Sequence, residues 1–289
     1  MSGKALKDYD FLFSTMGGIF QQKGGEINLV YNRPSEETVD CFPITWDAQH
    51  YYFGENRHFS QETYIHVATK EGFHKEGEIL IDGLFDVHQM VHHQGKLYIC
   101  NTGQNSLVVY DLKDKKVSHE ILRGSERQDI HHINGVWINK GKIYTTYLKQ
   151  AQDYKSDIIV HDLVTYEQLD VMEVGQGIHN VFIQGNKLYT CSSHSRQLLC
   201  VDLESHANVY WQFSEWKDYF WLRGMASDGE VLIVGGSQVK PRDYRHNINK
   251  NMIYLFDMEL NLLEEFEFNQ TKCGPIYDIR LLEGDKAHL

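Results

Sequence analysis

A repeat of about 45 residues runs through most of this chain. In its clearest copies, an apolar segment and a short polar turn precede a lysine, an apolar residue and a tyrosine. These copies end in Lys96-Leu97-Tyr98, Lys142-Ile143-Tyr144 and Lys187-Leu188-Tyr189. We call the residue at the lysine position of each copy its anchor. With looser copies included, the anchors are residues 50, 96, 142, 187, 231 and 286, which lie 46, 46, 45, 44 and 55 residues apart. Such spacing is typical of proteins that repeat one supersecondary unit.

Each copy contains a second strand-like segment, an apolar run that ends in an aspartate and another apolar residue. These runs are residues 107–112, 158–163, 198–203 and 253–258. The apolar residues follow runs and alternation and lack the spacing of an amphipathic helix. Only four prolines occur, which fits a strand-rich chain because proline cannot donate to a sheet. A unit of this length with four short strands is one blade of a β-propeller.

The chain ends predict how such a propeller closes. Residues 277–282 supply one innermost strand of a blade. Residues 11–15 and 27–31 supply strands of the type that follow the innermost strand. One C-terminal strand beside three N-terminal strands would complete a blade and hide the sheet edges of an open array. The sequence therefore predicts an all-β, six-bladed β-propeller that forms a single domain over residues 1–289.

Charge and composition exclude several classes of partner. Twenty-eight Lys and Arg against 40 Asp and Glu give a net charge of −12, which argues against nucleic-acid or membrane binding. No apolar run approaches the roughly 18 residues of a membrane span. The first ten residues are charged where a secretory signal is apolar, and the five cysteines contain no CxxC pair. We expect a reduced, cytoplasmic protein, either a monomer or a small homo-oligomer.

Polar residues recur where each innermost strand is expected to begin. The positions eight residues before the anchors are Phe42, His88, Asn134, His179, Arg223 and Asp278. Further polar residues nearby are Asp86, Asp129, His131, His132, Asn180 and Tyr277. Innermost strands begin at one face of a propeller's central channel, so we expect these side chains to converge at its mouth. A concave site with converging polar groups is the default position for a ligand.

A basic insertion is expected near the same face. The segment between anchor 231 and Asp257 is 26 residues long, against 15 for the segment from Lys96 to Asp111. Its extra part includes Lys240, Arg242, Arg245 and Lys250 but one acidic residue, Asp243. Basic residues beside a polar mouth focus the field on an anion, and Arg223 can bind a carboxylate or phosphate through two parallel hydrogen bonds. The predicted ligand is a small anion, such as a sugar acid or a phosphorylated metabolite.

Two kinds of chemistry fit these residues. In the first, His88, His132 and His179 hold a divalent metal (Mn, Fe, Zn or Ca), and Asp86 and Asp129 orient the rings. In the second, a histidine acts as general base, and Arg223 stabilises developing negative charge. Asp278 and Tyr277 are the remaining acid–base candidates, with Asp278 also a candidate orienting group. The expected substrate-binding residues are Arg223, Asn134, Asn180, Arg242 and Arg245.

A purely structural interpretation stays open for these positions, since repeat ancestry can copy a histidine that only supports a turn. Asp111, Asp162, Asp202 and Asp257 are interpreted as turn formers. Cys100 and Cys191 are interpreted as core residues. No serine-nucleophile elbow, P-loop, dinucleotide fingerprint or HExxH motif occurs in the sequence.

Five short motifs resemble, in order and spacing, those of a conserved-hypothetical family of bacterial propeller proteins. They are Asp86-Val87-His88, His132-Ile133-Asn134-Gly135, Ile178-His179-Asn180, Leu222-Arg223-Gly224-Met225 and Ile276-Tyr277-Asp278-Ile279. The family's own motifs are HD, HLNG, PHS, TRGLA and YDV, and the resemblance covers roughly residues 80 to 283. This chain departs from them at Gln89, where the family has Asp, and at Asn180, where it has Ser. The resemblance supports the position of the site and implies no particular reaction.

More distantly, the layout is similar to six-bladed sugar-lactonase propellers, whose calcium is held by acidic and Asn ligands. The histidine-rich set of this chain is closer to that of His-ringed propeller lyases, which use a divalent metal. Both are analogies at the level of the fold.

The expected function is that of an enzyme that binds a small anionic, sugar-like substrate at the channel mouth. The expected reaction is a lyase, isomerase or hydrolase step, with or without a metal. The alternative is a non-catalytic module that binds a protein or a glycan through the same face.

Overall fold

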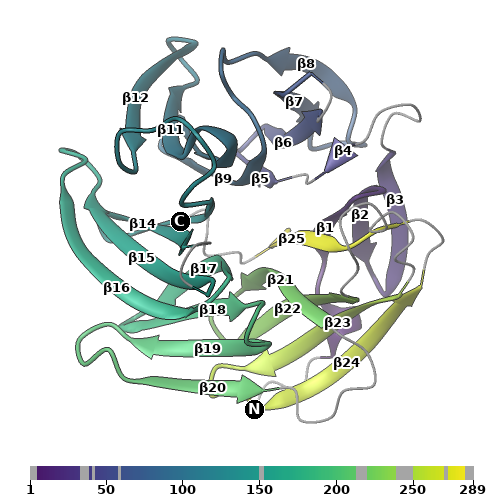
Figure 1. Cartoon of the computed structure of the whole chain (residues 1–289). Helices are drawn as coiled ribbons and strands as arrows, with labels where there is room; N and C mark the ends of the chain where they lie inside the picture. Colours follow the sequence, from purple (N-terminus) through teal and green to yellow (C-terminus); the bar gives the residue numbers. More distant parts are fainter. Residues whose placement is uncertain are drawn as a thin grey trace. The chain divides into compact units, whose positions relative to one another are not determined.

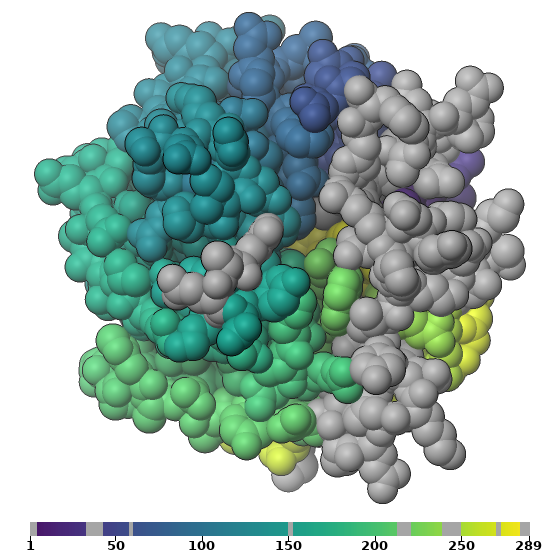
Figure 2. All heavy atoms as spheres, in the orientation of Figure 1, coloured from purple at the N-terminus to yellow at the C-terminus, as the bar shows by residue number. Residues whose placement is uncertain are grey.

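In the computed structural model, the described residues are 5–32, 39–40, 43–57, 60–149, 153–212, 220–238, 250–269 and 273–283; grey marks the others in Figures 1 and 2. They form six antiparallel sheets, five of four strands and one of five. Two single-turn 3-10 helices, η1 (Leu6–Asp8) and η2 (Thr102–Gln104), are the helical elements of this described part. The chain is a six-bladed β-propeller, as the repeat predicts.

The sheets fall into two compact units. Residues 34–181 form one, called here the middle unit, and residues 1–33 with 182–287 form the other, the terminal unit. Strand β17 (Ile178–Gln184) begins in the middle unit and pairs within a sheet whose other strands belong to the terminal unit.

The middle unit contains three complete blades. The first comprises β4 (Val39–Asp40), β5 (Ile44–Trp46), β6 (His50–Arg57), β7 (Glu62–Thr69) and β8 (Lys75–Ile79). The second comprises β9 (Val87–His93), β10 (Lys96–Asn101), β11 (Ser106–Asp111) and β12 (Lys116–Leu122). The third comprises β13 (Ile133–Asn139), β14 (Lys142–Lys149), β15 (Lys155–Asp162) and β16 (Gln168–Gln176). Phe42, the first position of the predicted polar set, lies outside the described residues.

The terminal unit contains the blade that joins the two chain ends. Its strands lie in the order β25 (Ile276–Leu281), β1 (Phe11–Thr15), β2 (Gly18–Lys23) and β3 (Glu26–Asn32). In Figure 1, yellow β25 lies beside purple β1, and Leu12 of β1 faces Arg280 of β25. One C-terminal strand therefore completes a sheet with three N-terminal strands, which confirms the predicted closure.

The remaining strands of the terminal unit form two meanders. One continues from β17 with β18 (Lys187–Ser192), β19 (Gln197–Asp202) and β20 (Asn208–Gln212). The other comprises β21 (Phe220–Ser227), β22 (Val231–Gln238), β23 (Lys250–Asp257) and β24 (Leu262–Asn269). Sequential strands are neighbours in both, as expected for propeller blades.

The strand register explains the sequence repeat. In three blades the anchor lysine begins the second strand directly opposite the aspartate that ends the third: Lys96 faces Asp111, Lys142 faces Asp162 and Lys187 faces Asp202. Opposite charges at such cross-strand positions stabilise a sheet. The two motifs recurring in the sequence are thus the two sides of one hairpin.

The repeated aspartates also form the turns that follow them, as predicted. The Asp111 Oδ1 atom accepts hydrogen bonds from the backbone N–H groups of Lys113 and Asp114, each at 2.9 Å. Asp162, Asp202 and Asp257 accept equivalent pairs of backbone bonds. These donors hold the pKa of the Asp111 carboxyl below its ordinary value. These aspartates are structural residues of the blade.

The hydrophobic cores lie between adjacent blades. In the middle unit, Val91, Cys100 and Leu107 of the second blade pack with Val136 and Ile159 of the third. In the terminal unit, the ring of Phe268 meets those of Phe13 and Phe20 edge-on, at 5.1 and 5.2 Å between centroids. Cys191 is fully buried, as is Cys100. Both cysteines that were predicted to be core residues therefore lie in the core.

Candidate functional site

Two innermost strands of the middle unit, β9 and β13, carry a β-bulge near their first residues. In β9, Met90 faces Ile99 and Val87 faces Asn101, so the two residues His88 and Gln89 oppose the single residue Cys100. In β13, Asn134 is the extra residue between the pairs Ile133–Tyr147 and Gly135–Thr146. Bulges redirect the side chains they contain and occur frequently beside active sites.

The backbone immediately before these strands is also unusual. Asp86 and His132, which precede Val87 and Ile133, have φ angles of 55° and 42°. This left-handed region is uncommon for residues other than glycine and carries a conformational penalty. Local strain and the bulges therefore coincide at the positions that the sequence repeat marks as polar.

The bulges and turns bring two of the predicted histidines together. The ring centroids of His88 and His132 are 4.7 Å apart, with the rings nearly perpendicular at 76°. Both side chains are largely buried, with 12% and 16% of their surface exposed. One ring comes from the second blade and the other from the third, so the contact depends on the packing of the two blades.

Each of these rings is oriented by an acidic residue. The Nδ1 atom of His132 lies 2.8 Å from Oδ1 and 3.0 Å from Oδ2 of Asp129. The Nδ1 atom of His88 lies 3.0 Å from the backbone carbonyl of Asp86 and 3.8 Å from its carboxylate. Asp129 thus contacts its histidine through the carboxylate, whereas Asp86 contacts His88 through the backbone carbonyl.

His179 follows the same pattern in β17. Its Nδ1 atom lies 2.8 Å from the backbone carbonyl of Gly177, and 6% of the residue is exposed. In all three histidines Nδ1 thus faces an oxygen acceptor, which assigns the proton of the neutral ring to Nδ1 and the lone pair to Nε2. This tautomer is the one that a base acting through Nε2 requires.

Two predicted asparagines lie close to these histidines in the chain and are buried. Asn134 is 2% exposed, and its Oδ1 accepts a hydrogen bond from Thr146 Oγ1 at 3.3 Å. Its Nδ2 atom has no hydrogen-bond partner among the described residues. Asn180 is 4% exposed and has a φ angle of 58°.

A group of charges that the sequence did not single out lies beside His131. Arg123 Nη2 and Lys149 Nζ contact the two oxygens of the buried Asp157 carboxylate, at 3.3 and 2.8 Å. Burial, followed by the nearby Arg123 and Lys149 charges, lowers the pKa of His131, whereas Asp157 opposes this shift. Arg123 and Lys149 lie outside the aligned repeat positions, so periodicity alone gives no signal for them.

The terminal unit has bulges at the equivalent positions. In β21, Arg223 and Gly224 oppose Gly235, and in β25 Tyr277 is the extra residue between Ile276 and Asp278. The Arg223 guanidinium lies over the rings of Trp221 and Tyr277, at 5.2 and 5.6 Å from their centroids. These distances are within cation–π range. The bulges therefore place two predicted residues, Arg223 and Tyr277, together.

Asp278 lies in a different environment. It is fully buried, and its Oδ2 atom is 3.2 Å from Nε of Arg280, which is 1% exposed. Its Oδ1 atom accepts the backbone N–H of Ile279 at 3.1 Å. Asp278 is therefore engaged in a buried ion pair with Arg280. Arg242, Arg245 and most of the basic insertion lie outside the described residues.

The described residues include no group of three or more His, Cys, Asp or Glu side chains arranged to hold a metal ion. His88 and His132 are neighbours, but they and His179 do not form such a group in the described part of the chain.

No protein-family model and no curated protein matches the sequence. Solved structures match at the level of the fold. A nidogen/laminin complex gives a TM-score of 0.71 at 11% identity, covering 96% of this chain and 99% of the matched chain. A protein of unknown function from Bacteroides caccae gives 0.67 at 14% identity, covering 95% and 99%. Hydrazine synthase of Kuenenia stuttgartiensis gives 0.55 at 16% identity, covering 79% and 66%. At these identities the matches support the propeller fold alone.

Among the described residues, no helix combines the length and the apolar character that crossing a bilayer would require.

Proposed function

We propose that this chain is an enzyme that transfers protons on a small anionic, sugar-like substrate, with His88 and His132 as its acid–base pair. The observation that carries the proposal is the contact between the two rings, 4.7 Å between centroids, together with the Asp129 carboxylate 2.8 Å from Nδ1 of His132. A carboxylate at Nδ1 orients an imidazole and stabilises its protonated form.

Two adjacent imidazoles can divide the work of a lyase or isomerase step. One neutral ring accepts a proton from a carbon next to the substrate carboxylate. The other ring, when protonated, donates to the departing oxygen or to the neighbouring carbon. Histidine suits both roles because its ordinary pKa lies close to neutral pH.

For the cysteines that the structure describes, burial disfavours covalent catalysis. The thiols of Cys100, Cys191 and Cys273 are buried, and desolvation raises the pKa of Cys191 and of Cys273 to about 12. A thiol with such a pKa contains little thiolate near neutral pH, and the thiolate is the nucleophile. Acid–base chemistry at the two histidines is thus the better supported alternative.

The anionic character of the substrate is supported by the charges beside His131. Arg123, Lys149 and Lys155 meet the carboxylates of Asp157 and Glu173, so this group of three cations and two carboxylates has one excess positive charge. Positive charge near a site attracts anions and stabilises an enolate-like intermediate.

The experiment is proton exchange in deuterated water with a panel of uronates, aldonates and phosphorylated sugars, followed by proton NMR. We expect one class of sugar acid to exchange a carbon-bound proton or to eliminate water in the presence of the protein. His132→Gln and His88→Gln should each abolish this activity, whereas His119→Gln, on the exposed part of β12, should retain it. Activity that survives in the double histidine variant would contradict the proposal.

A second candidate is a binding module without catalysis, which the Arg223 group favours. An arginine beside Trp221 and Tyr277 is a combination enriched at binding sites. In that case, glycan or protein binding should be lost in Arg223→Ala, while the histidine variants should bind normally.

A further inference from the structure

A cavity of about 440 Å³ lies between the first and second blades of the middle unit. Its volume is within the range of roughly 300–1,000 Å³ that is usual for small-molecule sites. β6, β7 and β8 supply one wall, and the end of β11 with the following turn supplies the other. None of the residues assigned above to acid–base chemistry lines it, so it is a separate feature of the chain.

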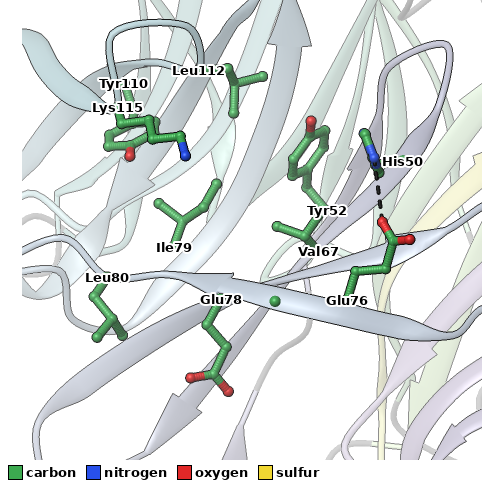
Figure 3. Close-up of a pocket in the computed structure, with 11 residues that line it drawn as sticks. His50, Tyr52, Val67, Glu76, Glu78, Ile79, Leu80, Tyr110, Leu112 and Lys115 are labelled. Atoms are coloured by element: carbon green, nitrogen blue, oxygen red, sulfur yellow. Dashed lines mark ion pairs between the residues drawn. The ribbon is translucent and has the colours of Figure 1, made fainter.

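The cavity has an apolar surface with charges on opposite sides. Figure 3 shows Val67, Ile79 and Tyr52 between Lys115, which lies near Tyr110 and Leu112, and the pair formed by His50 and Glu76. The Tyr52 hydroxyl is already engaged, because it donates to Asp47 at 2.7 Å. A ligand in this space would therefore meet apolar and aromatic atoms along most of its length.

The space exists because a glycine occupies a central position of the outer strand. Gly77 of β8 lies directly opposite Val67 of β7, and both line the cavity. A Cβ atom added at Gly77 would have no heavy atom within 4 Å. Side chains at opposite positions project to the same face of a sheet, so a larger residue at position 77 would fill the cavity without displacing a neighbour.

The lysine at one end of the lining favours an anionic group there. Glu76 lies 3.4 Å from His50, and Glu78, which points away from the space in Figure 3, pairs with Lys75 and His66. Within the described part of the chain, no carboxylate pairs with Lys115; the neighbouring Asp114 pairs with Lys116. Lys115 is therefore an unmatched positive charge at one end of the space, while the Glu76 carboxylate lies beside the His50 imidazole at the other end.

We propose that this cavity binds a small apolar carboxylate, with an aromatic or branched body against Val67, Ile79 and Tyr52 and the carboxylate at Lys115. The proposal goes beyond the acid–base function because it concerns different residues, which lie between the first and second blades, whereas the histidine pair lies between the second and third. Burial of the apolar body supplies most of the affinity, and the lysine selects the charge of the head group.

The test is an NMR titration of the full-length protein with phenylacetate, phenethyl alcohol and phenethylamine, which share a ring and differ in charge. We expect phenylacetate to bind best. Lys115→Ala should weaken its binding about fivefold, as expected for loss of one exposed ion pair. Lys113→Ala removes a lysine from the same turn and should change nothing, since Lys113 does not line the cavity.

Gly77→Leu should abolish phenylacetate binding by filling the cavity. Val67→Phe fills the same space from the opposite strand and replaces Gly77→Leu if that variant fails to fold. His132→Gln should bind phenylacetate normally, which separates this proposal from the acid–base function. Equal affinity for the three probes, unchanged binding in a folded cavity-filling variant, or no binding by the wild-type protein would overturn the proposal.

Discussion

The side chain of Gln89 links the two strands that carry the histidine pair. Its Oε1 atom accepts a hydrogen bond from the backbone N–H of Val136 at 2.7 Å, joining the bulge of β9 to β13 of the next blade. Gln89 is 1% exposed and follows His88, while β13 begins directly after His132. The distance between the two imidazoles is therefore set partly by an amide that touches neither ring.

Gln89→Leu should destabilise the protein and separate the two histidines. The substitution leaves the buried N–H of Val136 without its acceptor, which lowers the free energy of unfolding by about 1–3 kcal/mol. Urea denaturation measures the stability, and the proton-exchange assay measures the effect on the pair. Equal stability of Gln89→Leu and the wild type would show that this bond is dispensable.

Asp129→Asn should slow proton exchange by about 100-fold. The amide can still contact His132 but lacks the negative charge that stabilises the protonated ring. Because Asp129 acts through His132, kcat should decrease while KM stays near the wild-type value. Asp114→Asn, at an exposed turn of the same unit, is the control. A raised KM with an unchanged kcat would contradict this role.

Gly235→Ala should disturb the bulge that contains Arg223. A Cβ atom at position 235 would lie 2.4 Å from the backbone oxygen of Arg223 and 2.8 Å from Cγ2 of Ile276. Relieving these overlaps requires backbone movement, and we expect a loss of about 1–3 kcal/mol in the free energy of unfolding. The change should also appear in tryptophan fluorescence, since Arg223 lies over Trp221. The matched control is Gly77→Ala, whose added Cβ meets open space.

Stability should decrease as the pH falls from neutral to acidic values. Burial lowers the pKa of four histidines of the middle unit, His92, His93, His131 and His161. In the unfolded chain these rings regain ordinary pKa values near 6.5 and bind protons more readily than in the fold. Their contribution is therefore complete above about pH 6.5 and is lost progressively as the pH falls through their folded pKa values.

Denaturant unfolding measured across this pH range checks the direction of the effect. His161→Gln should flatten the curve, because its buried ring contributes to the difference in proton binding. His119→Gln, on the exposed part of β12, serves as the control. Stability that rises on acidification would contradict the expected sign.

Glu55→Ala should be strongly destabilising. Glu55 is fully buried and contacts Nε2 of His66 and Nε of Arg57, each at 2.9 Å. Removing one member of a buried charged group leaves its partners uncompensated and typically lowers the free energy of unfolding by about 3–5 kcal/mol. Glu62→Ala, which removes an exposed partner of Tyr64, should have little effect in the same thermal or urea experiment.

The sequence predicts much of this architecture because blade structure is encoded locally. The facing of Lys96 and Asp111 across a hairpin depends on a turn of a few residues, and turn residues and strand alternation act over short distances. The same periodicity placed His88, Asn134 and Arg223 at equivalent blade positions, all of which prove to lie at β-bulges; in the closing blade the equivalent position is Asp278, and the bulge falls on the preceding Tyr277. It did not predict the bulges, since an extra residue in one strand is defined only by its partner strand.

What the chain determines by itself is the set of strands, the turns that join them and the closure by β25, because each follows from short-range patterns and from the need to pair sheet edges. Tertiary structure alone decides which polar residues meet. The approach of His88 to His132, the sharing of Asp157 by Arg123 and Lys149, and the cavity opposite Gly77 all join residues of different strands or blades. Such contacts depend on how side chains pack between sheets, and a repeat in the sequence specifies the position of a side chain within a blade without specifying its partner across the interface.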